Sequence, residues 1–270
     1  MDRPRTLSAQ RLFCPKHISM LNEMAPGPRP IPALAPNHHP WQNQCLLHRM
    51  PPLLSKMPMD DSQYTTLRLG VMVSSVPNSA GESMRSSSGV LVKDHLGSKY
   101  MTTAAHRFPF DKNVYHPSPR GAIIGEISGL THTDIALMKL GDGVEFVNEP
   151  FGNTSTPASP FRLGDFIRMA ETKRQHLVFL DSPFTGLIEG QLMSKNIMRV
   201  PSDDQDQEIW SYIGQDSAHE LVDGACGSAI WNTDHRVIGF LSYASRTGLY
   251  KDHCLSIAAD HLLDRGYSMA

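Results

Sequence analysis

The chain has 270 residues, of which 40% are hydrophobic and 19% charged, so it has enough apolar material for the core of one or two small domains. A formal net charge of −2 gives no reason to expect a nucleic-acid partner. No apolar run approaches the roughly 18 residues needed to cross a bilayer, and the first residues lack the hydrophobic region of a signal peptide. We therefore expect neither membrane insertion nor secretion.

The cysteines and histidines of the chain indicate neither a disulfide framework nor a metal site. The chain has four cysteines, which are Cys14, Cys45, Cys226 and Cys254. They are too sparse for a disulfide-stabilised scaffold, and this favours the cytoplasm or another intracellular reducing compartment. His38, His39 and His48 lack paired cysteines and a regular ligand spacing, so no metal or other cofactor is expected.

Residues 1–61 form a stretch rich in Pro, Met and His, with no sustained hydrophobic period. This composition predicts a flexible extension. The remainder, residues 62–270, shows short β-prone runs separated by Gly, Pro, Asn and Asp, the spacing typical of sandwiches and barrels.

The β-prone runs fall into two groups. The runs predicted to build a first barrel, over about residues 62–140, are 67–76, 89–92, 99–105, 122–127 and 135–140. Residues 141–160 are rich in Gly, Asn and Pro and are predicted to link the barrels. The runs predicted to build a second barrel, over about residues 161–270, are 161–169, 176–180, 186–192, 208–213, 228–231, 237–244 and 254–258.

The hydrophobic period changes at the end of the chain. Apolar positions at Ile257, Leu262 and Leu263, followed by Gly266, predict a short terminal helix with a glycine stop. Small antiparallel barrels close their own edges, and a cleft between two barrels can take functional residues from both. The predicted fold class is all-β, with two antiparallel β-barrels and a short C-terminal helix.

Residues 223–230, Asp-Gly-Ala-Cys-Gly-Ser-Ala-Ile, place two glycines around one cysteine. Gly224 permits a sharp turn that presents Cys226 beside bare backbone amides. A nucleophile that attacks a carbonyl group needs this exposure, together with N–H groups that hold the oxyanion. Taken alone, Cys226 fits a small hydrophobic residue buried in a loop better than a nucleophile.

Two upstream segments complete a possible triad. His106 ends the β-prone run 100–106, and Asp134 stands at the head of the apolar run 135–140. A triad needs a base that is neutral near pH 7, a carboxylate that fixes its other ring nitrogen, and a nucleophile within reach. A lone His or an Asp before a strand usually has no such role. Together with Cys226, their order indicates catalysis.

At these segments the chain resembles the chymotrypsin-like (trypsin-like) protease superfamily, in a variant with cysteine at the nucleophile position. Serine members carry T-A-A-H, D-I-A-L and G-D-S-G-G in this order, matched here by residues 103–106, 134–137 and 224–228. A fourth match is residues 237–244, where the resemblance implies that Ser242 supports the catalytic Asp and that Tyr243 and Ala244 pair with substrate backbone. The resemblance covers about residues 67–258.

Two departures from the family pattern define the subtype. Cys226 replaces serine, as in viral chymotrypsin-like cysteine proteases with a G-x-C-G turn. The acid that usually precedes the nucleophile is replaced here by Ala225. In secreted trypsin-like enzymes, this acid receives the new amino terminus after zymogen cleavage. The replacement implies a site that forms without that step. Glu220 matches the base of the primary pocket, which implies a basic side chain at the cleaved position; a solvated loop acid is the alternative.

The resemblance implies a cysteine-type endopeptidase that acts on polypeptides without a cofactor. His106 would take the thiol proton, Cys226 would attack the scissile carbonyl, and Asp134 would orient the ring, while the N–H groups of Gly224 and Cys226 hold the oxyanion. The alternative is a catalytically inactive protease-like fold that binds a protein partner, because the acid is missing at Ala225 and a fold does not guarantee a function.

Overall fold

The computed structural model describes residues 59–109, 111–130, 133–151, 161–200, 205–214, 224–244 and 253–270, with only the backbone for 196–200 and 205–214. The chain divides into two compact units, Met1–Pro52 and Leu53–Ala270. Every described residue belongs to the second unit, so nearly all of the predicted extension lies outside the described part.

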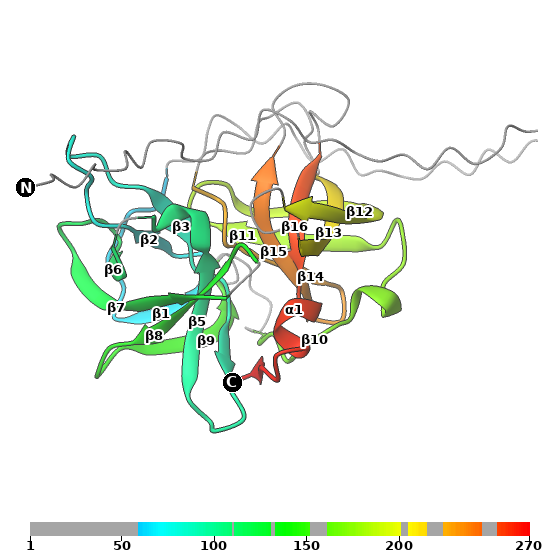
Figure 1. Cartoon of the computed structure of the whole chain (residues 1–270), viewed down its shortest axis with the longest axis horizontal. Helices are drawn as coiled ribbons and strands as arrows, with labels where there is room; N and C mark the ends of the chain where they lie inside the picture. The colour runs from blue at the N-terminus through cyan, green and yellow to red at the C-terminus, as the bar shows by residue number, and fades with distance from the viewer. Residues whose placement is uncertain are drawn as a thin grey trace, which may run out of the picture. The chain divides into compact units, whose positions relative to one another are not determined.

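The first half of this unit is a strongly curled sheet (Figure 1). Its strands run in the order β17-β4-β5-β8-β7-β6-β2-β3, in which β17 is the C-terminal strand Ser268–Met269, and β1 pairs in parallel with β9. A 3-10 turn, η1 (Ala105–Arg107), follows β5. The strands are β1 (Thr66–Leu69), β2 (Met72–Ser74), β3 (Arg85–Ser87), β4 (Leu91–Lys93), β5 (Lys99–Ala104), β6 (Asn113–His116), β7 (Ala122–Gly129), β8 (Ile135–Leu140) and β9 (Glu145–Pro150).

The first barrel differs from the sequence prediction in three respects. The predicted strand 67–76 is divided into β1 and β2, because Gly70 takes a φ of +75° that a regular strand does not have. Strands β3 and β6 were not predicted, and β3 consists of Arg85 and two buried serines, which carry no apolar signal. Strand β9 lies within residues 141–160, which the sequence assigns to a linker.

The second half of the unit is a closed barrel. Its strands run in the order β10-β15-β14-β11-β12-β13-β16, and β15 also pairs with β16, which closes the ring. A second 3-10 turn, η3 (Met169–Glu171), follows β10. The strands are β10 (Asp165–Phe166), β11 (Leu177–Ser182), β12 (Gly186–Val200), β13 (Gln205–Gly214), β14 (Ala229–Asn232), β15 (Arg236–Ala244) and β16 (Cys254–Ala258).

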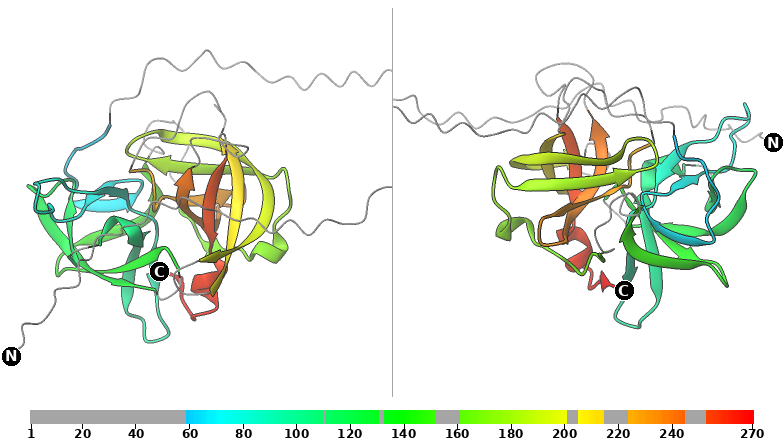
Figure 2. Two further views of the ribbon diagram at one scale, coloured as in Figure 1. Left: turned by 45° about the horizontal axis from the view of Figure 1, so that its top comes forward. Right: turned by 180° about the vertical axis from the view of Figure 1, so that it is seen from behind.

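The prediction of an all-β fold with two antiparallel barrels is confirmed (Figure 2). The strands of the second barrel agree closely with the predicted runs, except that the run 161–169 is reduced to β10 and β12 is longer than predicted. No helix in the described part of the chain is long and apolar enough to cross a membrane.

The C-terminal segment joins the two barrels. Helix α1 (Asp260–Leu263) ends before Gly266, whose φ is +78° and whose N–H donates to Leu263 O at 3.0 Å, as a glycine stop requires. The predicted short helix is therefore confirmed. Strand β17 (Ser268–Met269) then pairs with β4, so the last residues of the chain return to the first barrel.

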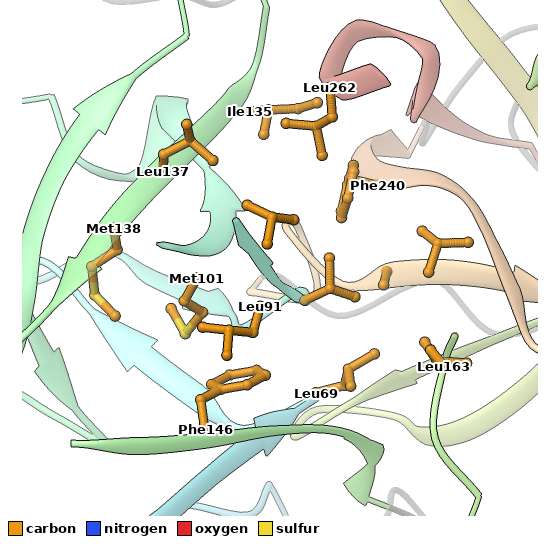
Figure 3. Packing of buried hydrophobic residues seen from close by; sticks show 14 of the residues in the cluster. Leu69, Leu91, Met101, Ile135, Leu137, Met138, Phe146, Leu163, Phe240 and Leu262 are labelled. Carbon is orange, nitrogen blue, oxygen red and sulfur yellow. The ribbon is translucent and has the colours of Figure 1, made fainter. Parts of the chain in front are cut away.

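A hydrophobic cluster runs through both barrels (Figure 3). It includes Met101 and Leu137 from the first barrel and Trp231 and Phe240 from the second. A second, smaller cluster lies within the second barrel and includes Ala225, which is 1% exposed. Burial of apolar area is the main force that holds packed layers together. The two barrels therefore have one continuous core and present fixed surfaces to each other.

Candidate active site

The pairing of β5 with β8 brings His106 and Asp134 together. Ala104, the last residue of β5, pairs with Ile135, the first residue of β8. His106 follows β5 in η1, and Asp134 immediately precedes β8. The N–H of Ala105 also donates to the backbone oxygen of Asp134 at 2.9 Å. Two segments that are separate in the sequence thus become neighbours at one end of strands β5 and β8.

The Asp134 carboxylate accepts hydrogen bonds from three groups. The ring of His106 approaches it through Nδ1, at 2.7 Å from Oδ2 and 2.9 Å from Oδ1. The backbone N–H of His106 donates to Oδ1 at 2.9 Å, and the Ser242 hydroxyl donates to Oδ2 at 2.5 Å. A carboxylate can only accept, so Nδ1 carries a proton and the lone pair of a neutral ring lies on Nε2. This is the tautomer that a general base needs.

The turn around Cys226 requires its two glycines. Gly224 has a φ of +109° and Gly227 a φ of +91°, values that side chains with a Cβ rarely adopt. A Cβ on Gly227 would also lie 2.6 Å from the backbone oxygen of Ser87 and 2.7 Å from the nitrogen of Ala104. The turn therefore packs directly against the backbone of the first barrel.

Two buried serines of β3 bind this turn from the other barrel. The N–H of Ser87 donates to Cys226 O at 3.0 Å, and the Ser86 hydroxyl donates to the same oxygen at 2.8 Å. The Ser87 hydroxyl donates to Gly224 O at 3.1 Å. These contacts hold the turn from the first barrel, while Ala225 between the two bound carbonyl groups packs into the apolar cluster of the second barrel.

The backbone amide of Cys226 points away from the carbonyl group of Ala225. In a trans peptide the C=O and N–H groups point in opposite directions. Ala225 O accepts the N–H of Ser228 at 3.2 Å, so the Cys226 N–H on the same peptide faces the other way. Within the described part of the chain, no hydrogen bond occupies the N–H of Gly224 or Cys226.

The electrostatic environment of Cys226 favours its thiolate. Burial raises the pKa of the thiol, but the hydrogen bond to His106 and the positive charges of His106 and Arg107 lower it by more. For His106, burial lowers the pKa, whereas hydrogen bonds to Asp134 and Cys226 and their negative charges raise it to about 9. The two shifts act together and favour the imidazolium–thiolate pair over the neutral pair. In its protonated form, the thiol donates to Ser242 O at 3.2 Å.

The remaining predicted site residues lie on β15 or outside the described residues. Tyr243 and Ala244 follow Ser242 on β15, and the Tyr243 side chain is exposed. Glu220 lies outside the described residues, as do His38, His39 and His48. Among the described residues, no group of three or more His, Cys, Asp or Glu side chains could hold a metal ion.

Sequence reasoning missed Arg107 and the two serines Ser86 and Ser87. Arg107 directly follows His106, and its Nη2 lies 3.4 Å from Cys226 Sγ. The run Ser86-Ser87-Ser88 is fully buried in the structure, although serine is mostly an exposed residue. Read without the structure, it resembles a solvated loop.

Comparison with known proteins shows the fold. No protein-family model and no curated protein matches the sequence. A solved glutamic acid-specific serine protease, described as using a histidine triad in substrate binding, aligns over 76% of this chain and 100% of its own length, with a TM-score of 0.57 and 14% identity. The chymotrypsin of Cellulomonas bogoriensis aligns with a TM-score of 0.52 and 14% identity, over 76% of this chain and 98% of its own.

Protease A of Thermobifida fusca aligns over the same shares, 76% of this chain and 98% of its own, with a TM-score of 0.53 and 13% identity. At such low identity, the likeness concerns the backbone and not the chemistry. The described strands and these alignments lead to one conclusion: the chain has the two-barrel fold of the chymotrypsin-like proteases.

Proposed function

We propose that this chain is a cysteine-type endopeptidase in which His106, Asp134 and Cys226 act as the triad. The observation that carries the proposal is the ring of His106, which is bound to the Asp134 carboxylate and raises the ionisation of the Cys226 thiol. A base that is oriented on one side and coupled to a nucleophile on the other is the arrangement that acyl transfer requires.

In the acylation step, the Cys226 thiolate attacks the scissile carbonyl carbon. The carbonyl oxygen becomes an oxyanion that accepts hydrogen bonds from the N–H groups of Gly224 and Cys226. The imidazolium of His106 then gives its Nε2 proton to the leaving amine as the C–N bond breaks. A thioester and a neutral ring remain.

In the deacylation step, the neutral His106 takes a proton from water while the water oxygen attacks the thioester carbonyl. The new oxyanion uses the same two amides. When it collapses, the C–S bond breaks, its electron pair returns to sulfur, and the carboxylic acid product leaves. The imidazolium and the thiolate are then restored. Asp134 keeps the His106 ring in its orientation throughout, and the hydroxyl of Ser242 keeps the Asp134 carboxylate from rotating.

The substrate in this proposal is an extended polypeptide. Its backbone would pair with β15 at Ser242, Tyr243 and Ala244, and Glu220 is the candidate for recognition of a basic side chain at the cleaved position. A thiolate nucleophile needs to stay reduced, so the proposal includes an intracellular reducing compartment.

The test is cleavage of a peptide library by the full chain under reducing conditions. Cys226→Ala should abolish cleavage, and Cys226→Ser should leave only a small remainder, because serine is of similar size but stays protonated beside His106. Both variants should melt close to the parent protein. Cleavage that survives in Cys226→Ala would refute the proposal.

The second candidate function is a protein-binding module without turnover. The observation that favours it is Ala225, which cannot form the ion pair that supports the nucleophile turn in secreted relatives. In the same experiment, this function would appear as an absence of cleavage in the parent protein. Binding to a protein partner would then be equal in the parent and in Cys226→Ala.

A further inference from the structure

The guanidinium of Arg107 is a second charged group at the Cys226 sulfur. Its Nη2 lies 3.4 Å from Sγ, and the side chain comes from η1, one residue after His106. Arg107 is half-buried, so its charge is partly shielded from water and acts more strongly than a charge on an open surface. The mechanism described above does not use this residue.

Arg107 adds a second positive charge beside the thiolate, next to that of the imidazolium. In the ion-pair form, the carboxylate of Asp134 and the thiolate of Cys226 are two anions that share one imidazolium. An uncompensated charge in a partly buried site is costly. A guanidinium supplies a positive charge that does not depend on a proton transfer near neutral pH.

The other contacts of the sulfur do not supply this charge. The carbonyl oxygen of Ser242 lies 3.2 Å from Sγ, and its negative end favours the protonated thiol. His106 favours the thiolate only while its ring is protonated, so its contribution falls as the ring titrates. Both His106 and Arg107 lower the pKa of Cys226, and only Arg107 does so without depending on a second titration.

We propose that Arg107 is a catalytic residue, whose constant charge holds the Cys226 sulfur ionised whether or not His106 carries its proton. The inference rests on the proposed cysteine nucleophile and divides its activation between two residues. His106 moves the proton. Arg107 stabilises the sulfur anion in the resting site, and again when the C–S bond breaks in deacylation and the electron pair returns to sulfur.

The experiment measures the alkylation of Cys226 by iodoacetamide as a function of pH, in the full chain and without a peptide substrate, by mass spectrometry of the Cys226 peptide. Arg107→Gln should move the midpoint of the profile to higher pH and slow alkylation below it by about tenfold, the effect expected from the loss of one charge-assisted hydrogen bond. Arg107→Lys should keep most of the parent rate. A profile of Arg107→Gln that overlies the parent profile would overturn the inference.

Two further variants keep the result specific. Arg120→Gln removes the same charge from an exposed position on the first barrel and should leave the profile unchanged. In His106→Ala, Arg107 is the remaining cation, so Cys226 should still ionise at a lower pH than in the urea-unfolded chain. Equal midpoints in these two states would overturn the inference even if Arg107→Gln did not fold.

The outcome for Arg107 is separate from the outcome for the proposed function. The alkylation profile requires a thiolate but no peptide cleavage. If the profile shifts in Arg107→Gln and the parent protein cleaves no peptide, the proposed function fails and the role of Arg107 at the sulfur stands. If the parent cleaves peptides and the profile does not shift, the proposed function stands and the role of Arg107 fails.

Discussion

Replacing Ser87 by alanine tests whether the first barrel shapes the oxyanion site. Its hydroxyl is fully buried and donates to Gly224 O at 3.1 Å. A buried carbonyl left without its donor costs about 1–3 kcal/mol. In the folded protein this cost falls on the peptide 224–225, which would turn to find another donor and would move the two amides on either side of it.

The magnitude follows from the role of those amides. Loss of one oxyanion donor typically lowers kcat by about 10²–10³-fold, and misplacement of catalytic groups by about 1 Å can cost about 10²-fold. Because the Ser87 N–H still holds Cys226 O, the turn is only partly released, and we expect kcat in Ser87→Ala to fall by about 10–100-fold. KM should change little, because strand β15, where the substrate is proposed to pair, is untouched.

Ser88→Ala is the matched control. Ser88 is equally buried, donates to Arg68 O at 2.6 Å and accepts the N–H of Val71 at 3.0 Å, but it has no hydrogen bond to the nucleophile turn. It should lower the melting temperature at least as much as Ser87→Ala, while kcat stays within about twofold of the parent.

A second readout separates the oxyanion site from the nucleophile. Alkylation by iodoacetamide forms no oxyanion, so Ser87→Ala should react at the parent rate while its peptide turnover falls. A Ser87→Ala protein that keeps its kcat would contradict this role of Ser87, as would losses of turnover in Ser87→Ala and Ser88→Ala that simply follow their losses of stability.

Three further predictions concern acids and pH. Ala225→Asp, which restores the acid of secreted relatives, should lower the free energy of unfolding in urea by about 3–5 kcal/mol, because it places an unpaired carboxylate in an apolar cluster; an unchanged urea midpoint would contradict this. The kcat/KM of peptide cleavage should decline above about pH 9, where His106 loses the proton that the leaving amine needs, and a profile still rising there would be inconsistent with this acid. His116 has its pKa lowered by burial, against the opposing hydrogen bond with Met72 O, and its Nε2 accepts the N–H of Tyr64 at 2.9 Å. The unfolded chain therefore binds this proton more readily than the folded chain, so stability should be lost as the pH falls below about 6.5, and His116→Asn should reduce that slope in urea unfolding at pH 7.5 and 5.5.

The sequence was most informative where local pattern and local structure coincide. The apolar run 135–140 is strand β8 without change, because four consecutive buried residues, Ile135 to Met138, leave no other placement. His106, Asp134 and Cys226 were recognisable because each sits in a short motif with its own turn or strand. Gly266 as a helix stop follows from its lack of a Cβ alone.

The features that sequence reasoning missed depend on contacts across the barrels. Arg107 contacts Cys226, which lies 119 positions further along the chain, and Ser87 contacts Gly224, which lies 137 positions further along. No period or spacing in one sequence encodes such a pair. Strand β3 was missed for a related reason: its serines are buried because they face polar backbone of the nucleophile turn, so hydrophobicity gives no sign of their burial.

The nucleophile turn has a mechanical consequence because it is fastened to both barrels. Cys226 O is held by Ser87 of the first barrel, and the next residue, Gly227, donates its N–H to Leu241 O of the second at 2.7 Å. The turn that carries the sulfur is thus hydrogen-bonded to both barrels. A movement of one barrel against the other must break these hydrogen bonds before it exposes much of the core. The enhanced reactivity of the Cys226 thiol should therefore be lost before the spectroscopic signals of unfolding change. It would report the first separation of the two barrels.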